Sequence, residues 1–136
     1  MSYPIAILEN FAPGVTATLK PAGIRTTGKL LEAAKDPKGR KQLAAKINVD
    51  EKCVLRWANM ADRMRIKGVG EDYAELLEAA GVDTVRELKY RNPHNLAVAM
   101  ADANTKRKLG VRLLPSEATI QRWIDAAKRL QLKISY

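Results

Sequence analysis

Apolar residues recur along the chain at helical spacing, and no segment shows the convincing alternation of a strand. The clearest helical stretches carry apolar residues three or four positions apart at Val54, Trp57, Ala61 and Met64, and again at Ile120, Trp123 or Ile124, Ala127 and Leu130. This spacing gathers apolar side chains on one face of a helix. Asp50 and Ser116 precede the two stretches and are typical N-caps. The pattern therefore predicts two long amphipathic helices in an all-α chain.

Start and stop signals divide the rest of the chain into shorter helices. Asp36-Pro37 and Asn92-Pro93 each place an N-cap residue before a proline, which is tolerated at the first helical position. Gly23 and Gly81 fit the glycine that closes a short helix, because glycine adopts the left-handed backbone without strain.

These signals occur twice in the same order. The segment Ile66 to Thr84 has a diverged counterpart at Leu8 to Thr26. The matching anchors keep a constant spacing: Leu19 with Leu77, Ala22-Gly23-Ile24 with Ala80-Gly81-Val82, Thr26 with Thr84, and Leu30 with Leu88. Trp57 and Trp123 match at a wider spacing, so the second copy contains extra residues. We expect them around residues 104–110, as a surface loop or a short extra helix.

The repeat predicts two units, residues 1–66 and residues 67–136, packed into one compact domain. A length of 136 residues suits such a domain, and the 46% of apolar residues can supply its core. A unit of this size cannot easily bury its own apolar face, so the two should pack together. We expect Trp57 and Trp123 to belong to the core.

The second copy contains a glycine hairpin, Ile66-Lys67-Gly68-Val69-Gly70, followed by Ala74 and Leu76-Leu77. Two glycines permit a tight turn and a close approach to a ligand, and Val69 would insert into the core. The next helix begins at once, so its free N–H groups and positive dipole end form an anion site suited to a DNA phosphate. The pattern fits both a purely structural turn and a backbone–phosphate contact.

From about Leu8 to Leu130 the chain resembles a bacterial family of tandem helix-hairpin-helix proteins, domain of unknown function 4332. The resemblance rests on residues 64–70, residues 73–88, Arg91-Asn92-Pro93 and the helix around Trp57. It implies two tandem helix-hairpin-helix units but no activity, because the family has no defined biochemical role. The wider superfamily is similar to modules of repair and recombination proteins that hold duplex DNA by its backbone.

Two departures weaken a phosphate grip at the hairpins. In the first copy, Asn10-Phe11-Ala12 replaces the glycine turn and Pro13 removes an N–H group. In the second copy, Glu71 and Asp72 would occupy the helix N-terminus themselves and repel a phosphate. The acids between Lys67 and Leu88 are Glu71, Asp72, Glu75, Glu78, Asp83 and Glu87.

The chain as a whole is nevertheless strongly basic. Its net charge of +9 favours an anionic partner, nucleic acid first. The densest bases are Lys35, Lys38, Arg40, Lys41 and Lys46, then Arg56, Arg63, Arg65 and Lys67, then Lys106-Arg107-Lys108 with Arg112. Lys106-Arg107-Lys108 also fits a solvated loop. The candidate nucleic-acid contacts are Lys67, Gly68, Val69, Gly70, Arg63, Arg65, Lys106, Arg107 and Lys108.

The resulting functional prediction is non-catalytic, sequence-nonspecific binding of nucleic acid, with duplex DNA as the partner. The alternative is a protein-interaction adaptor that uses the acidic helix after the second hairpin. Enzyme signatures are absent, and no cofactor is predicted. The lone His94 and lone Cys53 do not assemble a nucleophile–base pair or a metal site.

Location is predicted from what the sequence lacks. No apolar run approaches the roughly 20 residues of a membrane span. The first residues, Met1-Ser2-Tyr3-Pro4-Ile5, do not resemble a signal peptide. A single cysteine excludes an intrachain disulfide, so the cytoplasm is the expected compartment.

Overall fold

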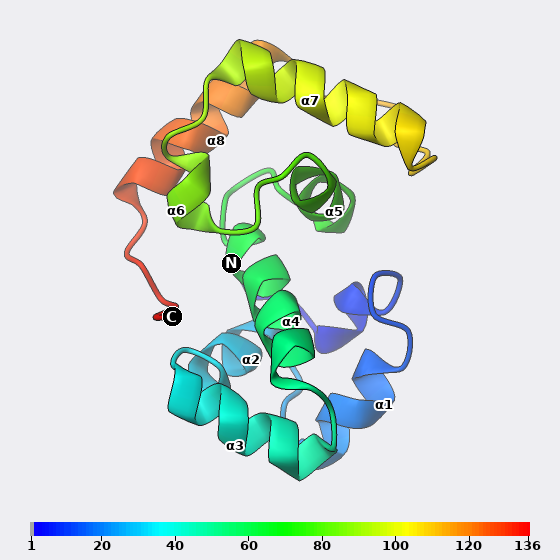
Figure 1. The fold of residues 1–136 in the computed structure, drawn as a ribbon, viewed down its shortest axis with the longest axis vertical. Coiled ribbons are helices and arrows are strands. Elements are labelled where there is room, and N and C mark those ends of the chain that lie inside the picture. The colour runs from blue at the N-terminus through cyan, green and yellow to red at the C-terminus, as the bar shows by residue number, and fades with distance from the viewer. Residues whose placement is uncertain (1) are drawn as a thin grey trace.

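The computed structural model describes residues 2–136 and is helical throughout (Figure 1). Two 3-10 helices, η1 and η2, accompany eight α-helices in the described part of the chain. Their bounds are η1 Ile5–Leu8, α1 Val15–Leu19, η2 Lys20–Ala22, α2 Thr27–Ala33, α3 Pro37–Ile47, α4 Glu51–Arg63, α5 Glu71–Ala79, α6 Val85–Leu88, α7 Pro93–Lys106 and α8 Glu117–Arg129. Within residues 2–136 the only β pairing is an isolated bridge between Pro4 and Thr26. The all-α prediction is confirmed.

Capping side chains start six of the eight described α-helices, among them the predicted caps Asp36, Asp50, Asn92 and Ser116. Asp36 accepts a hydrogen bond from the Gly39 N–H at 2.7 Å at the start of α3. Asp50 accepts one from the Lys52 N–H at 2.8 Å at the start of α4. Each such bond satisfies an N–H group that the first helical turn cannot pair internally.

The order of elements repeats along the chain, since α1 to α4 are followed by α5 to α8 in matching roles. Helices α4 and α8 each contain 13 residues and each end at an arginine. The largest difference lies near the predicted insertion. Helix α7 contains 14 residues where α3 contains 11, and a loop at 107–116 replaces the short connection at 48–50.

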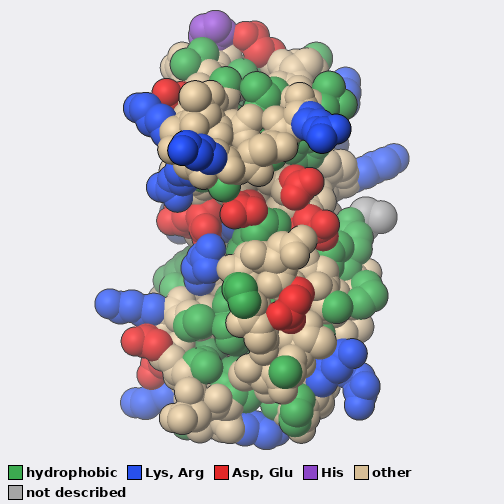
Figure 2. Space-filling view, turned by 90° about the vertical axis from the view of Figure 1, so that its right-hand side faces the viewer, with side chains coloured by type: hydrophobic (Ala, Val, Ile, Leu, Met, Phe, Trp, Pro, Cys, Tyr) green, Lys and Arg blue, Asp and Glu red, His purple; other side chains and the backbone are tan. Residues whose placement is uncertain are grey.

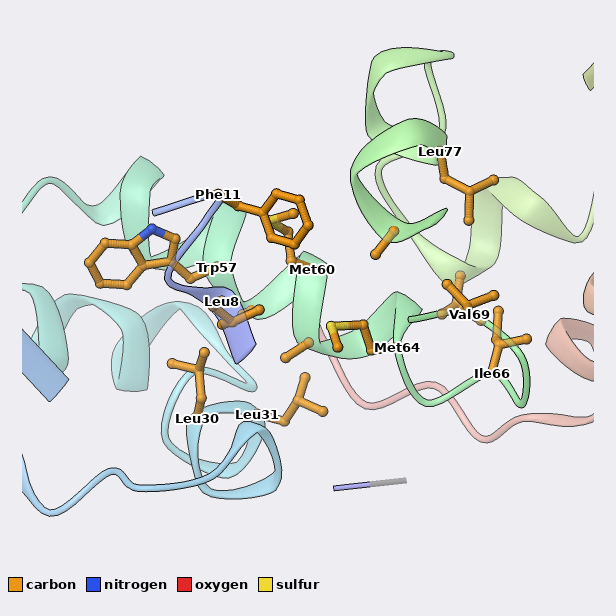
Figure 3. Packing of buried hydrophobic residues seen from close by; sticks show 14 of the residues in the cluster. Leu8, Phe11, Leu30, Leu31, Trp57, Met60, Met64, Ile66, Val69 and Leu77 are labelled. Carbon is orange, nitrogen blue, oxygen red and sulfur yellow. The ribbon is translucent and has the colours of Figure 1, made fainter. Parts of the chain in front are cut away.

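Helix α4 ends the first half of the chain (residues 1–66) and packs against the second half (residues 67–136), and both halves contribute to one continuous core. The helix packs against α2 and α3 on one side and against α5 and α6 on the other. Figure 3 shows Trp57 and Met60 of α4 beside Leu8 and Phe11, while Met64 lies toward Val69 in the second half.

The last residues run back from α8 to the first half of the molecule (Figure 1). The Ser135 N–H donates to the Lys35 carbonyl at 2.8 Å. The Tyr136 hydroxyl donates to Asn59 Oδ1 at 2.9 Å. This segment therefore bonds the end of the second half to Lys35, which follows α2, and to Asn59 of α4 in the first half.

Candidate nucleic-acid interface

The turn between α4 and α5 uses its two glycines differently. Gly68 has a left-handed backbone with φ of +90°, and a β-carbon placed there would lie 3.3 Å from Trp123 Nε1. Gly70 has φ of −88°, and nothing would lie within 4 Å of its β-carbon. Val69 between them is buried in the core. The fold therefore requires glycine at Gly68, whereas Gly70 leaves the backbone open to its surroundings.

The N-terminus of α5 lies among acidic side chains. Its N-cap, Gly70, supplies no capping side chain, and Glu71 and Asp72 occupy the first turn. Both acids line a groove of about 590 Å³ between this turn and the 107–116 loop, together with Arg112. The two carboxylates lower the potential at the amide end of the helix, so a phosphate would be repelled there.

An internal carboxylate fills the corresponding position in the first half. Glu9 accepts hydrogen bonds from the Gly14 N–H at 2.6 Å and from the Thr16 N–H at 3.1 Å. The bond from Gly14 is the main reason that the pKa of Glu9 lies below its usual value. The left-handed residue of this turn is Gly14, whereas the backbone of Asn10 is not left-handed. The first turn thus supplies its own anion.

Arg63, a candidate contact, lies inside the molecule with its side chain 0% exposed. Its Nε donates to the Ala74 carbonyl at 3.1 Å and its Nη1 to the Asp83 carbonyl at 2.6 Å. Burial lowers the pKa of this guanidinium, and the nearby Glu78 carboxylate opposes that shift. A buried side chain cannot reach a nucleic-acid backbone, so the assignment of Arg63 as a contact does not fit this structure. Arg63 instead joins the two halves.

Arg65 is also largely committed to internal bonds, with 11% of its side chain exposed. It donates to Asp62 Oδ1 at 2.6 Å and to the Gln131 carbonyl at 3.0 Å. Burial is the main cause of the raised pKa of Asp62, and the Arg65 charge acts against it. Little of Arg65 is left for an external ligand.

Lys106, Arg107 and Lys108 are all exposed at the end of α7. Lys106 Nζ lies 3.1 Å from Asp102 Oδ2, an ion pair between two exposed side chains. Asn104 anchors the loop beyond them, because its side chain exchanges two hydrogen bonds with the backbone of Val111. All three bases are accessible to a ligand, although Lys106 is already paired with Asp102.

The structure adds a group of bases that the hairpin motif does not indicate. Lys38, Lys41 and Lys46 are exposed on the outer side of α3, which contains no acidic residue; we call them the α3 lysine face. Two acids near it are engaged, since Asp36 caps α3 and Glu32 pairs with Lys35 at 2.9 Å, while the exposed Glu51 shares a groove with Lys41 beyond the end of α3. The sequence shows that these lysines are near one another along the chain. That all three are exposed on one side of α3 is seen only in the folded structure.

Arg40, from the same basic stretch, is buried beneath this face. Its Nη1 donates to the Ala34 carbonyl at 3.0 Å, and its guanidinium lies 5.8 Å from the centre of the Tyr136 ring. Arg40 therefore supports the fold while its lysine neighbours face solvent.

A second basic site lies where the Lys67–Gly68 end of the turn meets α8. Lys67, Arg122 and Arg129 line a groove of about 460 Å³ there, with Asp125 as its acid. On the side of the molecule shown in Figure 2, most basic side chains lie toward the two ends and acidic ones gather between them. The bases thus form separate patches on this side.

Other candidate chemistry is sparse. His94 Nδ1 lies 2.6 Å from Glu117 Oε1 on the surface. Burial raises the pKa of the Cys53 thiol and so disfavours its thiolate. Within residues 2–136, no three histidine, cysteine or acidic side chains are grouped as they would be around a metal ion.

None of the described helices combines the length and apolar character needed to cross a membrane.

The comparison with protein families agrees with this architecture. The family described as Domain of unknown function (DUF4332) matches residues 9–130, nearly the whole chain. The chain belongs to this family. Neither the curated proteins nor the solved structures provide a significant match to this DUF4332 chain. The DUF4332 assignment names a fold family without an activity, so function has to be argued from the surfaces described above.

Proposed function

We propose that this DUF4332 protein is a non-catalytic module that binds the backbone of nucleic acid without sequence specificity. The α3 lysine face is the main contact. The supporting observation is that Lys38, Lys41 and Lys46 are exposed on a helix without acids, while Asp36 and Glu32 beside it are engaged. The α3 lysine face is thus one patch of exposed positive charge on a chain with net charge +9.

Binding of this kind is driven by the release of counterions from the phosphates. Each phosphate neutralised by a base contributes a slope of roughly −0.9 to the dependence of log affinity on log salt for duplex DNA. The contact is with the phosphates rather than with base edges, so it carries no sequence preference.

The turn from Ile66 to Gly70, which matches the helix-hairpin-helix pattern, has a smaller part in this proposal. Its Gly70 end faces Glu71 and Asp72, which oppose a phosphate, and its Gly68 end packs against Trp123. We infer that the turn mainly joins α4 to α5. The exposed Lys106, Arg107 and Lys108 provide a secondary contact.

A salt titration with two charge-matched triple variants tests this assignment. Lys38→Gln, Lys41→Gln and Lys46→Gln remove three charges from the α3 lysine face. Lys106→Gln, Arg107→Gln and Lys108→Gln remove three charges elsewhere. Duplex DNA, single-stranded DNA and RNA are each titrated by fluorescence anisotropy between low and physiological salt.

We expect the α3 triple variant to lose most of its duplex affinity and to show a shallower salt slope, while the loop variant keeps most of its affinity. Equal losses in the two variants would assign binding to net charge alone. Absence of binding by the wild-type chain at micromolar protein in low salt would exclude the proposal.

A protein-interaction adaptor is the second candidate function. The supporting observation is the groove beside Glu71 and Asp72, which is bordered by Leu113, a leucine with 77% exposure. Reversing charge with Glu71→Lys and Asp72→Lys separates the candidates. Nucleic-acid binding predicts tighter duplex binding by this variant, whereas an adaptor function predicts loss of a partner that otherwise copurifies after nuclease treatment.

A further inference from the structure

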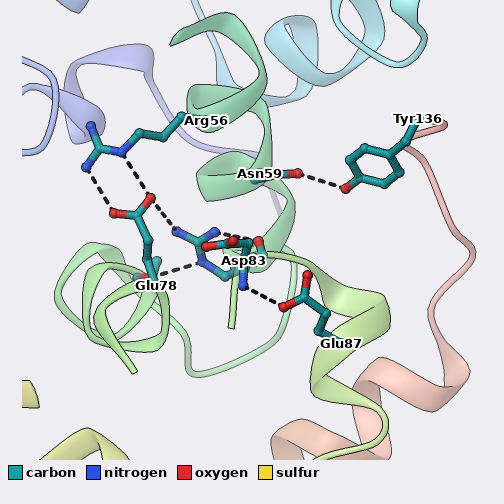
Figure 4. A network of polar contacts seen from close by, with 8 residues as sticks. Arg56, Asn59, Glu78, Asp83, Glu87 and Tyr136 are labelled. Carbon is teal, nitrogen blue, oxygen red and sulfur yellow. Dashed lines mark hydrogen bonds and ion pairs between the residues drawn. The ribbon is translucent and has the colours of Figure 1, made fainter. Parts of the chain in front are cut away.

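Two arginines of α4 bond the second half of the molecule, and Figure 4 shows one of them, Arg56, with its partner Glu78. The Nε and Nη2 atoms of Arg56 each lie 3.0 Å from a carboxylate oxygen of Glu78 in α5, a bidentate pair. Arg63 donates to the carbonyls of Ala74 and Asp83. Together these bonds fix the position of the following hairpin unit against α4.

Helix α8 carries the same two arginines. Arg122 and Arg129 occupy the sixth and thirteenth positions of α8, as Arg56 and Arg63 do in α4. Both are exposed. Arg122 donates only to Thr119 of its own helix at 3.0 Å, and Arg129 forms no ion pair with any of residues 2–136. The arginines that α4 uses to bond the following unit therefore have no carboxylate or carbonyl partner on α8 among residues 2–136.

The apolar residues that follow α4 and α8 also differ in exposure, and this difference does not depend on charge. After α4, Met64 and Ile66 are buried at 0% and 1% exposure. Their counterparts after α8 are Leu130 and Leu132, and Leu132 is 51% exposed. An apolar residue thus faces solvent at the position where α4 is followed by a buried one. The groove of Lys67, Arg122 and Arg129 lies on the same helix.

We propose that this surface of α8, formed by Arg122, Arg129 and Leu132, docks a further hairpin unit. The occupant resembles residues 67–91 and has a carboxylate at the position of Glu78. Arg122 would pair with that carboxylate, and Arg129 would donate to backbone carbonyls of the incoming unit. Leu132 would become buried in the interface. This inference does not rest on the proposed nucleic-acid binding, which uses α3.

A second copy of this chain is a poor occupant, and the repeat shows why. In its first unit, Lys20 stands at the position of Glu78 and Arg25 at that of Asp83. These bases would repel Arg122 and Arg129. In its second unit, Glu78 is already paired with Arg56. The partner is therefore a different unit with an acidic helix.

A three-unit chain tests the docking directly. A second copy of residues 67–136 is joined after Leu132, which keeps the register because Leu132 corresponds to Ile66. Amide hydrogen exchange is then measured in the appended copy of α5. A chain that ends at Leu132 is the control, because it shows the effect of losing residues 133–136, which contact the first half.

Docking predicts that amides of the appended α5 exchange at least about tenfold more slowly than in an Arg122→Glu variant, since 1.4 kcal/mol corresponds to a factor of ten. Changing the appended copy of Glu78 to arginine should restore protection in that variant by reversing the pair. Arg129→Ala should abolish the protection while leaving the first two units folded, because Arg129 is exposed there.

An unprotected appended unit, or protection that ignores these charge changes, would overturn the proposal. The original chain with Arg122→Gln and Arg129→Gln is also titrated with duplex DNA. A loss of affinity as large as that of the α3 triple variant, together with an undocked appended unit, would assign this surface to nucleic acid instead.

Discussion

Arg63 and Arg129 occupy equivalent positions at the ends of α4 and α8, but Arg63 is fully buried and Arg129 is exposed. The difference arises because α5 and the residues before α6 fold against α4, so the carbonyls of Ala74 and Asp83 surround the Arg63 guanidinium. The same residue type thus supports the fold at one position and faces solvent at the other.

Replacing Arg63 with alanine should lower the free energy of unfolding by about 2–5 kcal/mol, because buried carbonyls lose their donors and α4 loses its link to α5. Urea unfolding followed by circular dichroism measures the change. Arg129→Ala is the matched control and should change stability by less than about 0.5 kcal/mol. Similar losses in the two variants would contradict the structural role assigned to Arg63.

Gly68 and Gly70 should respond unequally to alanine. Gly68→Ala places a side chain on a backbone with φ of +90° and against Trp123 Nε1, so we expect a loss of about 1–2 kcal/mol. Gly70→Ala meets open space at a negative φ, so its cost is limited to the poorer N-capping of alanine, about 0.5–1 kcal/mol. Thermal unfolding of the two variants provides the comparison, and equal costs would contradict it.

The sequence predicted the elements that depend on local bonds. The caps Asp36 and Asp50 act within three residues of themselves, so their side chains identify helix starts without knowledge of the fold. Burial of Arg63 could not be predicted in this way, because it depends on how α5 and α6 pack on α4 after the chain has folded. The engagement of Glu9 by the first turn also escaped prediction, since its acceptor role follows from the path of residues 10–16.

Glu9 should make stability depend on pH in the acidic range. Its pKa in the folded protein is lowered by the hydrogen bond from the Gly14 N–H, so its contribution is present above the unfolded pKa of about 4.3 and is lost as pH falls through the folded value. Glu9→Ala should therefore lower the melting temperature at neutral pH, and the gap to wild type should shrink below about pH 4. A gap that stays constant down to strongly acidic pH would rule out this role for the carboxylate.

Tyr136 should titrate far above an ordinary tyrosine. Although 63% of the Tyr136 residue is exposed, desolvation of its hydroxyl beside Asn59, with a smaller effect of the Asp62 carboxylate, raises the pKa of Tyr136 to about 12. Because the folded pKa exceeds the unfolded value of about 10, its contribution to stability is complete below pH 10 and is lost as pH rises toward 12. Ultraviolet titration should show a tyrosinate transition near pH 12 that is missing in Tyr136→Phe. If both proteins titrate alike, the last residues do not hold the position seen beside Asn59.

Asn104 should control the order of the 107–116 loop. Its Nδ2 donates to the Val111 carbonyl at 2.9 Å, and its Oδ1 accepts from the Val111 N–H at 3.0 Å, so one side chain replaces two backbone bonds that a loop cannot make. Asn104→Ala should therefore accelerate amide exchange at Val111 and reduce stability by about 1–2 kcal/mol.

Tyr73→Phe is the control, because it removes only the 2.7 Å bond from the Tyr73 hydroxyl to the Leu113 carbonyl and leaves the Val111 amide bonded. Unchanged exchange at Val111 in Asn104→Ala would show that other contacts order the loop. Accelerated exchange in that variant alone would identify Asn104 as the residue that fixes Arg112 and Leu113 beside the acidic groove.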